Sequence, residues 1–589
     1  MAGAVTALPD WELRYRAPRV WLPDWAEDAP HRCLYVSNKT GTFELHAWDR
    51  TTDVHRQVTS RTNGTTDGAL SPDGAHIWWF DDTDGDEFGS WMRQPFHGGD
   101  DEPAVPDVPA GYPAGLEIGR QLTVVGRADD NGTTIHVQRA GSTTTLYSSP
   151  EDASVVGLTR DERLVLIEHS EHGDSRHPAL RVVDIDGAVV ADLWDGPGLG
   201  LHGVGFAPGG TTVLALHEQQ GRPLPLLWDP LSGEVTRLDV AIDGDLTADW
   251  YADGAALLVI AAKHGRSTLH RVALDGGVTD LPTPPGSVTD ATARPGGAVE
   301  YSWSSSAEPS FIRSVDGHVV LQAPEPIAPS SVPVTDSFVE GPGGVIHSLV
   351  ASPPGSGPFP TVFYVHGGPH DLESDAFYAE RAAFVDLGCA VVAINYRGST
   401  GYGSAWRDAI TGRPGLTELE DVRAVVEWAT DSGLADRERC VLSGASWGGY
   451  LALLGAGTQP DLWAAAVAAV PVADYVAAYE DEMEQLKAFD RSLFGGAPDE
   501  VPDVYRECSP LTYVDDVKAP LLVTAGANDP RCPLRQIDNY LEAAEQLGKE
   551  VEVYRYDAGH GSLVLDERVK QARLALDFVA RRLGLPAPA

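Results

Sequence analysis

The stretch LSGASWGGYLALLGAG, residues 442–457, places Ser446 among nearby glycines. The residues before it are typical of a buried strand, and the apolar residues after it are typical of a helix. Residues 444–448 therefore match G-x-S-x-G at a strand-to-helix junction, which is the pattern of a nucleophile elbow. We expect Ser446 to sit in a strained backbone conformation that projects its hydroxyl. Side chains at Gly444 and Gly448 would collide where the strand and the helix pass closest.

A serine hydroxyl needs a general base before it can attack a carbonyl at neutral pH. The segment YRYDAGHGS supplies His560 after a predicted strand, and Gly559 and Gly561 leave room for its ring. The segment VTAGANDPRCP supplies Asp529, whose carboxylate would fix the tautomer of His560. A lone Asp or His is more often structural, but the order Ser446, Asp529, His560 is that of α/β-hydrolases. We therefore predict a catalytic triad.

Acyl transfer also requires hydrogen-bond donors for the oxyanion. The segment FYVHGGPHD, residues 363–371, follows another apolar strand, and its glycines can turn backbone N–H groups toward a site that side chains would block. We expect the N–H groups of Gly368 and Trp447 to be the donors. The alternative is an ordinary Gly-Gly-Pro turn.

From about residue 335 onward, apolar strands alternate with amphipathic helices. The predicted strands lie at 361–365, 389–396, 439–444, 465–470, 519–526 and 551–557. Between them lie segments such as TELEDVRAVVEWATDSG, in which Leu419, Val422, Val425 and Val426 share one helical face. This alternation indicates a mostly parallel sheet covered by helices on both faces. We predict an α/β-hydrolase catalytic domain over residues 335–589.

A turn that opens into an apolar strand recurs between residues 30 and 325. Its clearest copies begin at residues 70, 157, 206, 250 and 293, and weaker copies begin at 29 and 115. The spacing suits four-stranded propeller blades. We predict an all-β seven-bladed propeller over 31–325, preceded by an N-terminal extension over 1–30 and followed by a Pro-rich linker at 323–333. The alternative is a pair of β-sandwiches.

The amino-acid composition restricts the kinds of partner and the cellular location that we expect for the protein. The net charge of −43 opposes binding to phosphate backbones and anionic lipids, so we expect no nucleic-acid or membrane partner. The five cysteines are scattered without a C-x-x-C pair, which favours a reducing compartment over a disulfide framework. The first 20 residues lack the basic region of a signal peptide. We expect a cytoplasmic protein.

Five motifs resemble those of the prolyl oligopeptidase family of serine peptidases, with the acylaminoacyl-peptidase and aminopeptidase-like branch closest. They are HGGP at 366–369, NYRGSTGYG at 395–403, GASWGGY at 444–450, ANDPRCP at 527–533 and DAGHG at 557–561. The resemblance covers the last 250 or so residues. The N-terminal half matches in architecture alone, since that family carries a seven-bladed propeller.

The resemblance implies the same triad and the same oxyanion donors, and it suggests that Arg531 holds a carbonyl of the substrate. One departure is Trp447, where the family often has tyrosine, so the walls of the substrate pocket need not match. Dipeptidyl-peptidase relatives recognise a free N-terminus with two adjacent glutamates. This chain has no Glu-Glu dipeptide, which disfavours that activity.

Two other segments carry possible ligands. HSEHGDSRH clusters His169, His172 and His177, a pattern that in a propeller is more often a solvated hairpin than a metal site. The acidic segment EDEMEQLKAFD, residues 480–490, could attract a free amino group, although a solvated helix face fits it better. We expect no metal and no organic cofactor.

These observations predict a serine peptidase that hydrolyses short peptides or small aminoacyl amides through an acyl-enzyme, of the aminopeptidase or acylaminoacyl-peptidase type. One alternative is an esterase or small-molecule amidase of a biosynthetic or resistance pathway that uses the same triad. Another is a propeller scaffold with an inactive hydrolase half. The sequence leaves open whether cleavage is exo or endo, which N-terminus is preferred, and whether the chain forms a homo-oligomer.

Overall fold

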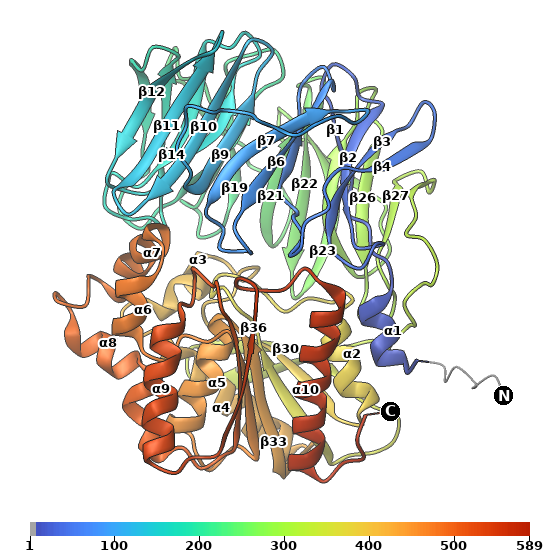
Figure 1. The fold of residues 1–589 in the computed structure, drawn as a ribbon, viewed down its shortest axis with the longest axis vertical. Helices are drawn as coiled ribbons and strands as arrows, with labels where there is room; N and C mark the ends of the chain where they lie inside the picture. Colours follow the sequence, from blue (N-terminus) through green and yellow to red (C-terminus); the bar gives the residue numbers. More distant parts are fainter. Residues whose placement is uncertain (1–7, 589) are drawn as a thin grey trace.

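The computed structural model describes residues 8–588, so residues 1–7 of the predicted N-terminal extension lie outside the described part. Its N-terminal half contains seven four-stranded antiparallel sheets arranged as the blades of a propeller above the C-terminal half (Figure 1). Each blade is built from four consecutive strands. This confirms the predicted seven-bladed propeller and excludes the pair of β-sandwiches.

The blades follow one another in chain order. They are β1 (Asp24–Trp25), β2 (Arg32–Ser37), β3 (Glu44–Asp49) and β4 (Val54–Gln57); β5 (Gly68–Leu70), β6 (His76–Asp82), β7 (Gly89–Pro95) and β8 (Glu102–Pro103); β9 (Tyr112–Ile118), β10 (Leu122–Asp129), β11 (Gly132–Arg139) and β12 (Ser142–Ser149); β13 (Ala153–Leu158), β14 (Leu164–His169), β15 (Ala179–Asp184) and β16 (Val189–Leu193); β17 (Leu201–Phe206), β18 (Val213–His217), β19 (Leu224–Trp228) and β20 (Val235–Arg237); β21 (Asp245–Trp250), β22 (Ala256–Lys263), β23 (Arg266–Ala273) and β24 (Val278–Leu281); and β25 (Ser287–Ala293), β26 (Val299–Ser304), β27 (Phe311–Ser314) and β28 (Val319–Leu321).

The turn that recurs in the sequence joins the first and second strands of each blade. The turns of all blades except the second line a cavity of about 550 Å³. Arg120 and Arg160, from the third and fourth blades, cross this cavity to Glu27 and Asp28 of the first blade at N–O distances of 2.5–2.9 Å. Loops between the second and third strands contact the C-terminal half instead, for example at Gly85 against Gly559 and at Glu218 with Arg407. The cavity therefore lies at the propeller face turned away from the hydrolase, and ion pairs span it.

The C-terminal half is built on one eight-stranded sheet with the order β29-β30-β32-β31-β33-β34-β35-β36. All six predicted strands are present, and β31 to β36 pair in parallel. The two strands that the sequence pattern missed form an antiparallel edge. The bounds are β29 (Thr335–Gly341), β30 (Gly344–Ala351), β31 (Phe359–Val365), β32 (Ala390–Asn395), β33 (Ala435–Ala445), β34 (Ala465–Ala469), β35 (Leu521–Gly526) and β36 (Val551–Tyr556).

Helices cover both faces of this sheet, as the α/β-hydrolase prediction requires (Figure 1). One face packs against α4 (Leu416–Asp431), α5 (Trp447–Thr458) and α9 (Leu534–Gln546). The other packs against α1 (Asp10–Arg16), α2 (Ala379–Asp386) and α10 (Leu565–Leu583). The remaining helices are α3 (Ser404–Arg407), α6 (Tyr475–Asp481), α7 (Glu484–Phe494) and α8 (Pro502–Cys508), with 3₁₀ turns at Asp408–Ile410 and Pro510–Asp516.

The N-terminal helix α1 belongs to the hydrolase core rather than to the propeller. Trp11 is buried against α2 and α10. Arg14 forms an ion pair with Asp386 of α2 and donates to the carbonyl oxygens of Pro329 and Ser330 at 3.1 and 2.7 Å. The segment that links the two halves is therefore tied to the catalytic half by the helix that precedes the propeller.

A polar network joins the propeller to the hydrolase on one side. His177, after β14, lies between Asp174 and Asp408, at N–O distances of 2.5 and 3.3 Å. Arg407 forms an ion pair with Glu218 of the fifth blade. Burial lowers the pKa of His177, but the hydrogen bonds to both carboxylates outweigh it and raise the pKa to about 9. A buried imidazolium thus bridges the two halves at neutral pH.

All five cysteines are free and buried. Among residues 8–588, no helix is long and apolar enough to cross a membrane.

Candidate active site

Ser446 lies at the sharp turn between β33 and α5, with φ +58° and ψ −120°. This confirms the strained backbone predicted for a nucleophile elbow. A Cβ on Gly444 would lie 2.5 Å from the carbonyl oxygen of Val365, and one on Gly448 would lie 2.1 Å from the same atom. Both glycines are therefore needed because the turn packs directly against the end of β31.

Asp529 and His560 form a close pair at the ends of adjacent strands. The His560 Nδ1 atom lies 2.8 Å from Asp529 Oδ2. The other oxygen, Oδ1, accepts hydrogen bonds from the backbone N–H groups of Arg531 and Cys532, both at 2.9 Å. Asp529 is buried and His560 is half-buried. The carboxylate is thus held rigidly and presents one oxygen to the imidazole.

The loop that carries His560 is in direct contact with the propeller. A Cβ on Gly559 would lie 1.8 Å from the carbonyl oxygen of Gly85, in the turn between β6 and β7. A Cβ on Gly561 would meet nothing within 4 Å. The sequence predicts that both glycines make room for the imidazole ring. In the structure Gly559 is needed for a different purpose. Without a side chain, its backbone can lie directly against the backbone of Gly85 in the propeller.

The predicted oxyanion loop lies beside the serine. A Cβ on Gly367 would lie 3.3 Å from Ser446 Cβ and 3.9 Å from Ser446 Oγ. Gly368 has φ +120° and precedes a cis peptide bond, a conformation that a side chain would strain. Trp447 is the first residue of α5, so the helix offers no acceptor for its backbone N–H.

The side chain of Trp447 is anchored by a residue that the sequence reasoning missed. Its indole Nε1 donates to Glu418 Oε1 of α4 at 3.2 Å, and its ring packs edge-on against Tyr450 with centroids 4.9 Å apart. Complete burial raises the pKa of Glu418 to about 8. A glutamate inside an amphipathic helix pattern carries no signal that it faces a tryptophan 29 residues later.

Arg531 does not stand free. Its Nε lies 2.8 Å from Glu87 Oε1, and its NH2 lies 3.0 Å from Oε2. Glu87 belongs to the β6–β7 turn and has φ +59°, an uncommon conformation outside glycine. With Asp67 and Asp82 it lines a cavity of about 620 Å³ between the two halves, which also exposes His560. Burial and the neighbouring carboxylates raise the pKa of Asp67.

A second cavity, of about 450 Å³, reaches the site from the side covered by α1, α2 and α10. His560 lines it, as do Ala445, which precedes Ser446, and Gly367 of the predicted oxyanion loop. The predicted triad loop therefore separates two cavities. One faces the propeller and brings Asp67, Asp82 and Glu87 together with Arg531. The other lies within the catalytic half, and Arg568 lines both.

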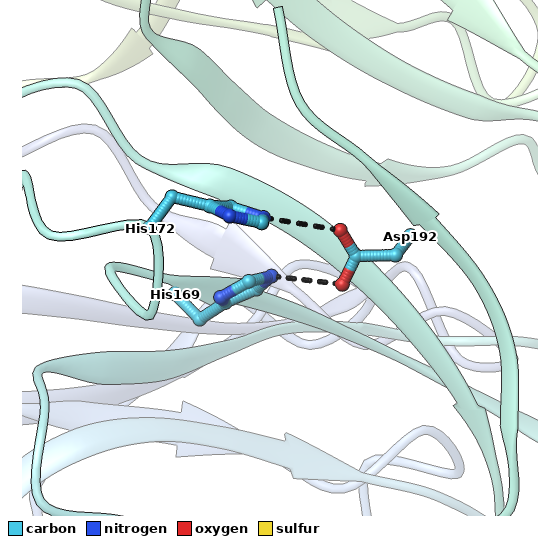
Figure 2. A group of neighbouring side chains, drawn as sticks. All are labelled: His169, His172 and Asp192. Carbon is cyan, nitrogen blue, oxygen red and sulfur yellow. Dashed lines mark hydrogen bonds and ion pairs between the residues drawn. The ribbon is translucent and has the colours of Figure 1, made fainter. Parts of the chain in front are cut away.

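The histidine cluster of the propeller divides in two. Figure 2 shows His169 and His172 facing the two oxygens of Asp192, with Nε2–Oδ2 and Nε2–Oδ1 distances of 3.2 and 3.4 Å. His177 belongs to the network between the halves instead. His169 is buried, so the expectation of a fully solvated hairpin is wrong there. Arg181 Nε also lies 2.7 Å from Asp192 Oδ2, and this guanidinium opposes a cation at the same carboxylate.

The acidic segment 480–490 is not a solvated face throughout, which corrects that expectation. Glu482 and Asp490 are each 5% exposed, and burial raises both pKa values. The charge of Asp490 adds to the shift of Glu482. The exposed members Glu480 and Asp481 form ion pairs with Arg535 of α9. The buried pair arises because α6 and α7 fold back over each other, which the sequence pattern does not reveal.

Comparison with known proteins supports the resemblance found in the motifs. Residues 375–586 match the model of the prolyl oligopeptidase family, which confirms that prediction. The dipeptidyl aminopeptidase BIII of Pseudoxanthomonas mexicana is 31% identical over 232 residues, covering 38% of this chain and 34% of that protein. The acylamino-acid-releasing enzyme of Arabidopsis thaliana is 31% identical over 200 residues, covering 33% and 26%. The chain therefore spans about a third or less of the length of these relatives.

Solved structures match the whole chain. A prolyl endopeptidase structure superposes with a TM-score of 0.86 at 16% identity, covering 98% of this chain and 91% of the other. A puromycin hydrolase structure superposes with a TM-score of 0.80 at 20% identity, covering 98% and 97%. These matches confirm the fold, a propeller joined to an α/β-hydrolase.

Proposed function

We propose that this protein is a serine peptidase that hydrolyses short peptides or small aminoacyl amides. The observation that carries the proposal is the Asp529–His560 pair, 2.8 Å apart, together with Ser446 on a strained turn. His560 and Ala445, the residue before the serine, line the same cavity. We assign residues 31–325 to the propeller domain and 335–589 to the catalytic domain. The five buried, unpaired cysteines support a cytoplasmic location, where thiols stay reduced.

In the proposed reaction Ser446 Oγ attacks the scissile carbonyl while His560 takes its proton. Asp529 holds His560 in the required tautomer and stabilises the imidazolium. The backbone N–H groups of Gly368 and Trp447 bind the oxyanion of the tetrahedral intermediate. His560 then protonates the leaving amine, and water hydrolyses the acyl-enzyme by the same route in reverse.

The acidic cavity supports substrates with a free amino group. Asp67, Asp82 and Glu87 face a space that also exposes His560, so an ammonium group there would meet carboxylates on the propeller side. Arg531, held by Glu87, is our candidate for binding a substrate carbonyl. This arrangement favours the aminopeptidase type over the acylaminoacyl-peptidase type, whose substrates carry a blocked amine.

An esterase or small-molecule amidase remains the second candidate, because esters and amides pass through the same tetrahedral intermediate. The likeness to a structure named puromycin hydrolase motivates it. Matched aminoacyl p-nitroanilides and p-nitrophenyl esters separate the two. A peptidase is expected to hydrolyse the anilides as well as the esters, at comparable rates. Hydrolysis of the esters alone supports the second candidate.

The first test is labelling by a fluorophosphonate, which reacts with an activated serine. We expect stoichiometric labelling of the wild-type chain, loss of labelling in Ser446→Ala, and full labelling in Ser432→Ala, a matched change at the end of α4. Absence of labelling in the wild type would instead support the propeller scaffold with an inactive hydrolase half. Free and N-acetylated aminoacyl p-nitroanilides, compared side by side, then test the amino-group preference.

A further inference from the structure

Three arginines line the cavity within the catalytic half. Arg381 donates to the carbonyl oxygens of Ser374 and Ala376, and the other two have no use in the reaction described above. Arg19, just after α1, and Arg568, in the first turns of α10, both line the cavity together with His560. The Arg568 guanidinium lies over the Phe43 ring at 5.6 Å, and its NH1 makes a long contact of 3.4 Å with the carbonyl oxygen of Ser562.

Neither arginine has a carboxylate partner. Within residues 8–588, no Asp or Glu oxygen lies within 4.0 Å of the guanidinium of Arg19 or Arg568. The side chain of Arg19 makes one contact, 3.4 Å from NH2 to the carbonyl oxygen of Arg14. The two guanidinium groups also repel each other, and this repulsion adds to burial in lowering the pKa of Arg19 to about 10. Arg19 is nevertheless charged at neutral pH.

In the described part of the chain, the carboxyl groups of the same cavity do not pair with these two guanidinium groups. Burial raises the pKa of Glu373 to about 8, which favours its protonated form at neutral pH. Burial also raises the pKa of Glu380, while the Arg568 charge acts in the opposite direction. Asp371 lines the cavity as well, in the loop after the predicted oxyanion glycines. Two unpaired guanidinium groups in a partly buried space form a site for an anion.

The position of this cavity relative to the triad identifies the part of a substrate that it would hold. The leaving amine must lie on a side where His560 can protonate it. The other cavity, on the propeller side, holds Arg531 and Glu87, which the proposed function assigns to the acyl part. The leaving group is then directed into the cavity beneath α1 and α10. Ala445, next to Ser446, lines that cavity.

We propose that Arg19 and Arg568 bind the α-carboxylate of the leaving amino acid or short peptide. This inference rests on the proposed peptidase function and names its substrate class. The preferred substrates are free peptides that end within one or a few residues after the scissile bond. A peptide would then lie with its ammonium end in the acidic cavity and its carboxylate end at the two arginines. The volume of about 450 Å³ falls within the range of small-molecule sites.

The test compares a free dipeptide and tripeptide with the same peptides amidated at the C-terminus. We expect kcat/KM to be about 10- to 100-fold higher for the free acids, the range expected for hydrogen bonds to a charged group. Equal or lower values for the free acids would overturn the inference. An aminoacyl p-nitroanilide, which has no carboxylate, is run in parallel. If this anilide is hydrolysed in a Ser446-dependent manner, a missing acid preference counts against the arginine site alone. If no substrate is hydrolysed, the proposed function itself fails.

Two variants assign the preference to the arginines. In Arg19→Met and in Arg568→Met, the ratio of kcat/KM between acid and amide is expected to fall toward one, mainly through a higher KM for the acid, and Arg568→Lys is expected to keep part of it. Arg139→Met removes an exposed arginine at the end of β11 and is expected to keep the wild-type ratio. Because Arg568 also packs on Phe43, its variants are checked by thermal unfolding. Should they fail to fold, Arg19→Met decides, and an unchanged ratio there overturns the assignment.

Discussion

Arg531 of the catalytic half forms an ion pair with Glu87 of the propeller, with Nε 2.8 Å from Oε1. The two residues are 444 positions apart. The Arg531 side chain is 50% exposed, so the pair contributes little to stability. Its consequence is geometric, because the guanidinium proposed to bind substrate is aimed by the other domain. The two halves must be together for this part of the site to exist.

Glu87→Gln is therefore expected to weaken the binding of substrates that have a free amino group. The change removes a negative charge from the acidic cavity and loosens Arg531. We expect KM for free aminoacyl p-nitroanilides to rise about tenfold, the order of a lost hydrogen bond to a charged group, with a smaller change for N-acetylated analogues. Glu102→Gln, which alters an exposed propeller ion pair with Arg93, serves as the control. An equal effect on free and acetylated substrates would argue against recognition of the ammonium group.

Asp529→Asn tests the orientation of His560. The two backbone N–H groups that bind Oδ1 fix which side of an amide would face them, so the amide NH2 would point at His560 Nδ1. The imidazole would then carry its proton on Nε2 and could not accept one from Ser446. We expect kcat to fall by about 10⁴-fold, as in serine proteases that carry this change. Asp557→Asn, an exposed neighbour, should retain activity, and a near-normal kcat for Asp529→Asn would refute the triad.

Gly559→Ala tests the contact between the catalytic loop and the propeller. The new methyl group would meet a backbone oxygen at 1.8 Å, which cannot move without displacing either the β6–β7 turn or the loop of His560. We expect a loss of at least tenfold in kcat/KM, with the fold of each domain retained. Gly561→Ala, two residues on, meets open space and should cost far less. Equal losses for the two variants would show that the contact has no influence on the site.

The junction between the halves should weaken in alkaline solution. The pKa of His177 is about 9 in the folded protein and about 6.5 when unfolded, so its contribution is complete below pH 6.5 and is lost as the pH rises through 9. The difference corresponds to about 3 kcal/mol, shared among His177, Asp174 and Asp408. Thermal unfolding of the wild type and His177→Gln should therefore differ most near pH 6.5 and converge above pH 9. A constant difference across this range would contradict the assignment.

The features that could be predicted from the sequence are those that depend on residues close together in the chain. The seven blade turns, the six core strands and the glycines around Ser446 each impose a residue type within a few positions. The strands β29 and β30, at one edge of the sheet, were not predicted because they are partly exposed and lack a continuous apolar run. The contact partners of Trp447 and Arg531 could not be predicted for a different reason. Glu418 and Glu87 approach them through the folding of distant segments, and no spacing in the chain encodes that approach.

The closure of the propeller has a mechanical consequence. Every blade takes its four strands from one continuous stretch, so no strand of the first blade hydrogen-bonds into the sheet of the last. The seam between them depends on side chains, both apolar ones such as Cys33 and Ile312 and polar pairs. Arg50 NH1 of the first blade lies 2.7 Å from Glu300 Oε1 of the last. Separate side-chain contacts can be lost one by one, whereas a ladder of backbone hydrogen bonds must break as a unit, so we expect the ring to open at this seam before any sheet is disrupted. The propeller ring is therefore closed by side-chain contacts, and not by shared strands, at the junction of its first and last blades.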